Sequence, residues 1–196
     1  GSMDKSKYEE LKKSWQKWVA PYQHADLNHS LRQLANSLLP YLGLWVLMIL
    51  SLRVSYWLTL LLIIPAAGFL VRIFIIFHDC GHGSFFKSKE ANRRVGFWLG
   101  VLVFTAGEQW WHSHAIHHAS AGNLDKRGIG DVMTMTVEEY QRSTRWQKLT
   151  YRIFRHPFFM LGFGPFVSFL IAPRFAASGS GKLERQSVVY TNLALL

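Results

Sequence analysis

The sequence predicts an all-α, polytopic integral membrane protein with transmembrane helices and a cytoplasmic region rich in histidine. Three observations predict this class. Apolar residues gather into long runs, as expected of a chain that meets both lipid and water. Strongly basic segments separate the runs, as in membrane proteins with positively charged cytoplasmic loops. Five of the nine histidines fall into two tight clusters, each of which directly follows an apolar run.

Residues 1–35 are expected to form a separate N-terminal segment, followed by a membrane domain over residues 36–196. Gly1 to Met3 look like the scar of an expression tag. Further on, apolar residues recur at helical spacing among lysines, which predicts an amphipathic cytoplasmic helix on an anionic membrane surface. A solvated helix packed on the rest of the protein explains the pattern equally well. The apolar positions are Tyr8, Leu11, Trp15, Trp18 and Val19.

Two apolar runs follow and predict a hydrophobic helical hairpin. The first, Leu38 to Leu52, is expected to start near Asn36 so that it reaches across the bilayer. The second, Tyr56 to Phe77, carries one charge, Arg72, near its end. As a helix this second run would be about 33 Å long, enough to cross a hydrocarbon core of about 30 Å. A buried hairpin in a soluble protein is the alternative.

The rest of the chain alternates between shorter apolar blocks and polar segments. Residues 95–106 are too few to span and predict an interfacial or re-entrant helix. Residues 158–172, broken by glycine and proline, predict a short spanning or intramembrane helix. Residues 173–186 are expected to form a polar loop. The chain then turns apolar from Ser187 to Leu196, so the membrane domain is expected to be incomplete at its C-terminal end.

The formal net charge of +10 raises the question of a nucleic-acid partner. The basic residues flank apolar runs and no nucleic-acid motif accompanies them, so no nucleic-acid partner is expected. Residues 78–156 hold 11 of the 22 lysines and arginines and residues 4–35 hold six, which predicts that both regions face the cytoplasm. The single cysteine, Cys80, excludes a disulfide within the chain and is interpreted as a small buried residue.

The two histidine clusters carry the chemistry. His78 and His82 form an HxxxH pattern, and His114, His117 and His118 form an HxxHH pattern. On a helix, residues four apart lie on one face, so His78 and His82 can chelate one ion. By the same rule His114 pairs with both His117 and His118, and these two neighbours point about 100° apart. The arrangement therefore suits a two-metal site better than a one-metal site.

The resemblance to a known family rests on the amino-acid sequences of these two clusters. The stretches HDCGHGSFF at residues 78–86 and HSHAIHHA at residues 112–119 closely resemble the first two histidine boxes of membrane fatty acid desaturases. Residues 130–140 and 151–165 also resemble the bacterial acyl-lipid members, and the resemblance runs from about residue 36 to the end. The family has a third HxxHH-type box near its C-terminus. This sequence lacks it, so the N-terminal part of such an enzyme is expected.

The resemblance implies oxygen-dependent desaturation of fatty acyl chains at a histidine-ligated centre of two iron ions. Imidazole alone does not select the metal, but iron can change its oxidation state and zinc cannot. The five histidines of the two boxes would then be the metal ligands and the catalytic residues, with further ligands beyond Leu196. Acyl chain length, double-bond position, head group and oligomeric state do not follow from the sequence.

Metal-bound histidines usually donate their second ring N–H to a carboxylate or a carbonyl. Four carboxylates stand near the boxes, and Glu108 lies four residues before His112, on the same helical face. His112 matches the family wording without being a ligand, so a supporting role beside the ligands is expected for it. The candidates for this supporting shell are Asp79, Glu108, His112, Asp125 and Asp131. Pairing with the adjacent Lys126 and Arg127 is the alternative for the last two carboxylates.

The implied partners are a fatty acyl lipid, the membrane and an external electron donor. No haem-binding or flavin-binding segment is present in the sequence, so a ferredoxin-like or cytochrome-type protein would supply electrons. An acidic donor would be attracted to the basic cytoplasmic face. Two alternatives stay open: a related di-iron hydroxylase or monooxygenase, and a non-catalytic fragment with structural zinc or no metal.

Overall fold

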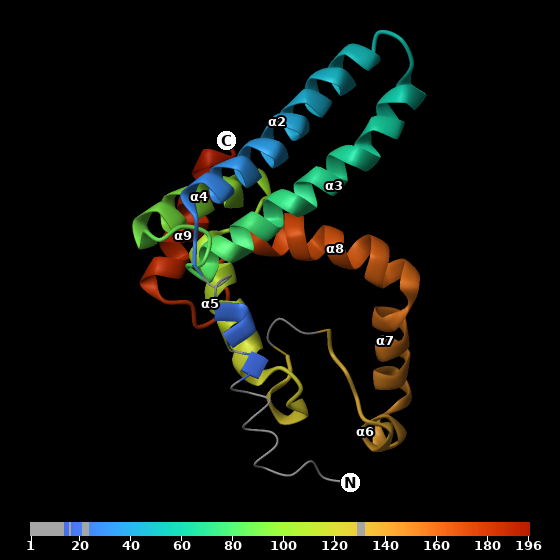
Figure 1. Cartoon of the computed structure of the whole chain (residues 1–196). Coiled ribbons are helices and arrows are strands. Elements are labelled where there is room, and N and C mark those ends of the chain that lie inside the picture. Colours follow the sequence, from blue (N-terminus) through green and yellow to red (C-terminus); the bar gives the residue numbers. More distant parts are fainter. Residues whose placement is uncertain (1–13, 16, 21–23, 129–131) are drawn as a thin grey trace. The chain divides into compact units, whose positions relative to one another are not determined.

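The computed structural model describes residues 14–15, 17–20, 24–128 and 132–196. The chain divides into two compact units, residues 1–96 and residues 97–196. Within the described ranges the regular structure consists of helices, without a strand, which confirms the predicted all-α class (Figure 1). The predicted amphipathic helix of residues 4–35 lies partly outside those ranges. Of its described apolar residues, Trp15, Trp18 and Val19 are exposed.

The first unit contains the predicted hairpin, formed by α2 (Leu27–Ser51) and α3 (Tyr56–Gly81), which lie side by side (Figure 1). Both helices are long and apolar enough to cross a bilayer. Helix α2 begins well before Asn36, where the sequence placed its start. The side chain of Asp26 accepts a hydrogen bond of 2.8 Å from the backbone N–H of His29 and caps the helix, so the polar residues after it are helical too.

The two helices pack through a narrow seam of buried residues. On α2 the seam recurs at close to heptad spacing, the pattern of two helices that pack lengthwise. Three of the five buried residues of α2 are serines, and small residues at helix contacts in membranes allow close approach of the backbones. Ser37 of α2 and Ile73 of α3 are fully buried. The buried residues of α2 are Ser30, Ser37, Tyr41, Met48 and Ser51.

Polar contacts close both ends of the hairpin. At the connecting turn, the hydroxyl oxygens of Ser51 and Thr59 lie 2.7 Å apart. Toward the other end, Arg72 donates from Nη2 to Oδ1 of Asn36 over 3.0 Å. The one charge in the second apolar run is thus satisfied by the neighbouring helix. A hydrogen bond between helices in lipid is worth about 0.6 kcal/mol on average and rarely exceeds about 1.7 kcal/mol.

We expect Asn36→Leu to destabilise the hairpin by about 1 kcal/mol, because Arg72 would lose its acceptor on α2. Unfolding of the purified protein in mixed micelles of increasing denaturing detergent measures the change. Asn36→Gln, which keeps an amide oxygen, is the matched control and should recover part of the loss. An unchanged unfolding midpoint in Asn36→Leu would show that this hydrogen bond contributes nothing.

Beyond α3 the chain turns sharply and enters α4 (Lys89–Leu102). Gly83 adopts a positive φ of 68°, which residues other than glycine rarely adopt. The side chain of buried Asn92 then fastens the turn, because its Oδ1 accepts from the N–H of Phe86 over 3.0 Å and its Nδ2 donates to the carbonyl of Phe86 over 2.7 Å. On the other side, Ser30 of α2 donates to the carbonyl of Phe85 over 2.6 Å. The segment after the HxxxH cluster is thereby fixed to the hairpin.

The second unit is built on α5 (Gly107–Ser120) packed against α9 (Lys182–Ala194). Part of the predicted polar loop over residues 173–186 is therefore helical. Helix α9 starts there because the carboxylate of Glu184 accepts a hydrogen bond of 2.8 Å from the N–H of Gly181 at the helix N-terminus. The backbone of α5 is also bonded to a side chain of α9: the backbone N–H of Glu108 donates to the hydroxyl of Ser187 over 3.1 Å.

Between α5 and α9 the chain forms η2 (Leu124–Lys126), α6 (Val137–Arg142) and α7 (Arg145–Arg155). Next come η3 (Phe159–Phe163), α8 (Gly164–Phe166), η4 (Val167–Ile171) and η5 (Ala172–Arg174). This last region is helical, as expected for residues 158–172, and two of its segments, η3 and η4, are π-type turns. Helix α7 and the segment Phe159–Arg174 are together long and apolar enough for a third span, but they are bent by 60°.

Candidate metal centre

The HxxxH cluster lies at the end of α3, and its two imidazoles face each other. The Nε2 atoms of His78 and His82 are 3.2 Å apart, and the ring centroids are 4.5 Å apart. The helix runs through His78 and ends at Gly81, so the helical spacing assumed from the sequence is confirmed. At its far side the His78 ring places Nδ1 3.0 Å from Oδ1 of Asp79.

The HxxHH cluster lies on α5 and repeats the same arrangement. The Nε2 atoms of His114 and His118 are 3.0 Å apart, with ring centroids 4.4 Å apart. Trp110, one turn earlier, stacks on the His114 ring at 4.4 Å between centroids with an angle of 19° between the planes. Since an indole stacked on one face restricts rotation of the imidazole, Trp110 helps to set the direction of the His114 ring.

His117 stands apart from this pair. Its ring centroid lies 6.1 Å from that of His114 and 6.0 Å from that of His118. Of the two pairings that the sequence allowed for His114, the one four residues away is therefore the close one. The ring of His117 is thus farther from His114 than the ring of His118 is.

The nitrogen separations test whether a metal fits these pairs. Two ligand nitrogens at right angles on one ion, with metal–nitrogen bonds of about 2.1 Å, lie about 3.0 Å apart, and at a tetrahedral angle about 3.4 Å apart. The observed separations of 3.2 Å and 3.0 Å fall in this range. An N–H···N hydrogen bond between two neutral rings has a similar length. Each pair can therefore bind one ion with little movement. Without an ion, the same separation fits a hydrogen bond between the two rings.

The candidate supporting residues differ in where the structure places them. Asp79 is placed as expected, with its carboxylate against Nδ1 of His78. His112 instead faces Glu184 of α9, with 3.7 Å between Nδ1 and Oε1. Asp125 lies in η2. The ion-pair partner of Arg127 is Glu139, whose hydrogen bond raises the pKa of Arg127, and the charge of Asp125 contributes to this rise. Asp131 lies outside the described residues.

Two contacts of α5 with other segments were not predicted from the sequence: that of His112 with Glu184 and those of Gln109. Glu184 was missed because it lies 72 residues beyond His112 in a segment expected to be a loop. Gln109 was missed as well. Its Nε2 donates to the carbonyl of Phe175 over 3.2 Å, and its Oε1 accepts from the N–H of Ala177 over 2.9 Å. The histidine helix is thus tied to the loop that precedes α9, at contacts that leave no periodic signal in a sequence.

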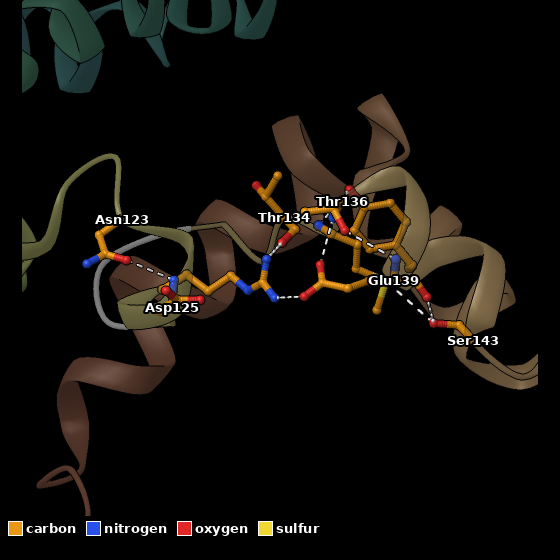
Figure 2. A network of polar contacts seen from close by, with 9 residues as sticks. Asn123, Asp125, Thr134, Thr136, Glu139 and Ser143 are labelled. Atoms are coloured by element: carbon orange, nitrogen blue, oxygen red, sulfur yellow. Dashed lines mark hydrogen bonds and ion pairs between the residues drawn. The ribbon is translucent and has the colours of Figure 1, made fainter.

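The loop that follows α5 is closed by a polar network (Figure 2). Arg127 donates to the backbone carbonyl of Thr134 over 2.9 Å and forms an ion pair with Glu139 of α6. The second carboxylate oxygen of Glu139 accepts from the N–H of Thr136 over 2.7 Å, and the hydroxyl of Thr136 accepts from the N–H of Glu139. This reciprocal pair is the capping box at the start of α6. Glu139 therefore joins the loop to the helix.

The ion pair with Arg127 changes the pKa of Glu139. The hydrogen bond from Arg127, with that from the backbone of Thr136, lowers the pKa of Glu139 from its ordinary value of 4.5 to about 2. A carboxyl with a lowered pKa stabilises the folded form above its ordinary pKa, and this contribution is lost as the pH falls through the lowered value. The loop should therefore stay closed above about pH 4.5 and open as the pH approaches about 2.

We expect Glu139→Gln to open this loop at neutral pH, because a neutral amide cannot replace the charge that holds Arg127. Hydrogen–deuterium exchange of the Thr136 amide, corrected for intrinsic rates, should accelerate several-fold. Glu138→Gln is the matched control, since Glu138 is exposed and only reaches Arg142 at 3.6 Å one turn away. Equal protection in both variants would contradict the assignment.

Among the cavities in the described part of the second unit, two apolar ones share a lining residue. The larger, of about 1030 Å³, is lined mainly by aromatic residues and methionines of the segments around α7 and η3, among them Met133, Trp146 and Phe159. The smaller, of about 450 Å³, is lined by Trp110, the residue stacked on His114. Ser168 lines both. The cavity beside Trp110 and the cavity beside α7 therefore adjoin at Ser168.

The sequence profile of the family described as Fatty acid desaturase matches residues 54–196. The chain belongs to the fatty acid desaturase family. A Fatty acid desaturase from Bacillus subtilis (strain 168) is 52% identical over 180 residues, which cover 92% of this chain and 51% of that protein. The histidine pairs of α3 and α5 are thus features of a desaturase chain.

More distant relatives belong to the same family. The sn-1 acyl-lipid omega-3 desaturase (ferredoxin) of Synechocystis is 43% identical over 53 residues, 27% of this chain and 15% of that protein. An endoplasmic-reticulum omega-3 fatty acid desaturase of Vigna radiata is 32% identical over 106 residues, 52% of this chain and 28% of that protein. The chain spans about half the length of the Bacillus relative, and less of the others. No solved structure matches it.

Proposed function

We propose that the full-length protein desaturates fatty acyl chains in the membrane, at a centre of two iron ions held by both histidine boxes and by further ligands beyond Leu196. The observation that carries this proposal is the pairing of Nε2 atoms at 3.2 Å on α3 and 3.0 Å on α5, the separation of neighbouring ligands on one ion. Membership of the desaturase family supports iron as the metal.

In this proposal His78, His82, His114, His117 and His118 are the ligands supplied by this part of the protein. When bound, iron would supply the change of oxidation state that the use of oxygen requires. Asp79 would accept the Nδ1 proton of His78, which directs Nε2 toward the metal and makes it a stronger donor. Trp110 would hold the His114 ring in place by stacking.

The apolar cavities suit the acyl substrate. An acyl chain in these cavities would contact apolar side chains and would pass Trp110, the aromatic residue next to His114. Removing one hydrogen from each of two adjacent CH₂ groups consumes one O₂, two electrons and two protons and leaves a double bond and two waters. The electrons would come from an external donor. The name of the Synechocystis relative, which includes ferredoxin, supports a donor of that kind.

The proposal also places the histidine boxes on the cytoplasmic side. This orientation rests on the 11 lysines and arginines of residues 78–156, against one in the short connection between α2 and α3. A soluble donor could then reach the iron ions from the cytoplasm.

Product analysis of the full-length protein tests the proposed reaction. The protein is expressed in a host that lacks desaturases, and the acyl lipids are hydrolysed and analysed by mass spectrometry. We expect products lighter by two hydrogens, with a double bond at a fixed position. Products heavier by one oxygen would instead identify a hydroxylase. Unmodified lipids together with zinc in the purified protein would contradict both enzymatic interpretations.

A further inference from the structure

Helix α7 (Arg145–Arg155) carries two parallel stripes of opposite character. Three apolar side chains, Trp146, Leu149 and Ile153, share one face at helical spacing, and they are 78%, 47% and 50% exposed. Each is preceded by a basic residue, and Arg155 extends the basic stripe by one turn. The basic residues are Arg145, Lys148, Arg152 and Arg155, and the helix has no acidic residue. A short helix with an exposed apolar stripe beside a cationic one is typical of membrane interfaces.

The basic residues fall into two kinds. Lys148 donates to the backbone carbonyl of Gln141 over 2.8 Å, and Arg152 donates to the hydroxyl of Tyr140 over 2.6 Å. These two join α7 to α6. Arg145 and Arg155, at the ends of α7, have no hydrogen bond or ion pair with any residue in the described part of the chain. Two cations at the ends of one helix are thus available to an anionic partner.

The direction of the chain after α7 points to lipid as that partner. The segment Phe159–Arg174 is apolar enough to enter a bilayer with α7, yet the two are inclined by 60°. Just before and within it, Phe158 and Leu161 are 80% and 83% exposed. With this angle, α7 can lie along the membrane surface while the segment Phe159–Arg174 enters the bilayer. Because four cations line it, anionic headgroups fit it better than neutral ones.

We propose that α7 is an interfacial helix that binds the surface of an anionic phospholipid bilayer. Trp146, Leu149 and Ile153 enter the boundary between headgroups and acyl chains, and Arg145 and Arg155 bind lipid phosphates. The sequence pattern assigned a place at the membrane surface to residues 4–35 and an interfacial or re-entrant place to residues 95–106, but none to α7. This inference is independent of the metal centre, so its failure would leave the proposed reaction intact.

Fluorescence quenching in lipid nanodiscs tests the placement of the helix. The full-length protein, with its native cysteines replaced by serine, carries one bimane-labelled cysteine, at Ile153→Cys or at the control position Glu138→Cys on exposed α6. We expect a nitroxide at the fifth acyl carbon of the lipid to quench the Ile153 label several-fold more than the Glu138 label, and iodide in water to do the reverse. An Ile153 label reached by neither quencher would show that the rest of the protein or a second copy covers the stripe. That result would overturn the proposal.

A second arm tests the choice of lipid. Nitroxide-labelled phosphatidylglycerol should quench the Ile153 label more strongly than nitroxide-labelled phosphatidylcholine at equal mole fraction. Each cation near a phosphate contributes up to about fivefold to this preference, so Arg145→Gln with Arg155→Gln should remove most of it. Arg142→Gln on α6, whose side chain reaches Glu138, is the matched control and should change nothing. Equal quenching by the two lipids in the unchanged protein would refute anionic binding.

Discussion

Replacing His118 with alanine in the full-length protein should abolish desaturation and lower the iron content. The imidazole of His118 is one half of the pair on α5, so its removal leaves His114 without the second nitrogen at 3.0 Å. Residues that merely support metal ligands cost about 10- to 100-fold when mutated, and loss of a ligand should cost at least the upper value. We expect the same of His78→Ala and His117→Ala.

Two controls separate ligand loss from misfolding. His24→Ala removes an exposed imidazole outside both boxes and should leave activity and iron unchanged. Asp79→Asn keeps the side-chain shape but weakens the acceptor at Nδ1 of His78, and should reduce activity by about 10- to 100-fold without abolishing it. Full iron content and normal turnover in His118→Ala would remove His118 from the ligand set.

Replacing Asn92 with leucine should destabilise the protein by about 2 to 4 kcal/mol, the largest effect on stability that we expect. The N–H and the carbonyl of Phe86 both depend on this one side chain, and each would be left buried without its present partner. A buried polar group left unsatisfied costs about 1 to 3 kcal/mol. Because the residue fixes the turn after His82, iron content should fall together with stability.

Thermal unfolding of the purified protein measures this change. Asn92→Asp keeps the acceptor for the N–H of Phe86 but loses the donor to its carbonyl, and should lie between the unchanged protein and Asn92→Leu. Asn123→Ala is the control on an exposed asparagine whose side chain accepts from the N–H of Asp125 over 3.0 Å. An equal loss in Asn92→Leu and Asn123→Ala would contradict the role assigned to the buried amide.

The helical hairpin and the pairing of histidines four residues apart could be predicted because both rest on local periodicity. His78 and His82 face each other since the helix that carries the second apolar run continues through His78. The choice of His118 over His117 as the close partner of His114 could not be made, because spacings of three and four both share a helix face.

Boundaries and distant contacts were harder to predict. Helix α2 starts at Leu27 because of a cap at Asp26, while the hydrophobic pattern starts later. The contact of His112 with Glu184 and the bonds of Gln109 to the loop before α9 join segments about 70 residues apart. Such contacts depend on packing between helices, which a single sequence does not encode as a pattern. The 60° bend after α7 was likewise not predicted, although the helix that follows it was.

X-ray absorption at the iron edge of the full-length protein tests the central claim most directly, because it reports the atoms bound to the metal. The histidine assignment predicts about two iron ions per chain, with nitrogen neighbours at about 2.1 Å and the multiple scattering that imidazole rings produce. This scattering should weaken in His82→Ala and in His118→Ala. A first shell of oxygen or sulfur without imidazole scattering, or a protein that binds zinc in place of iron, would contradict the account.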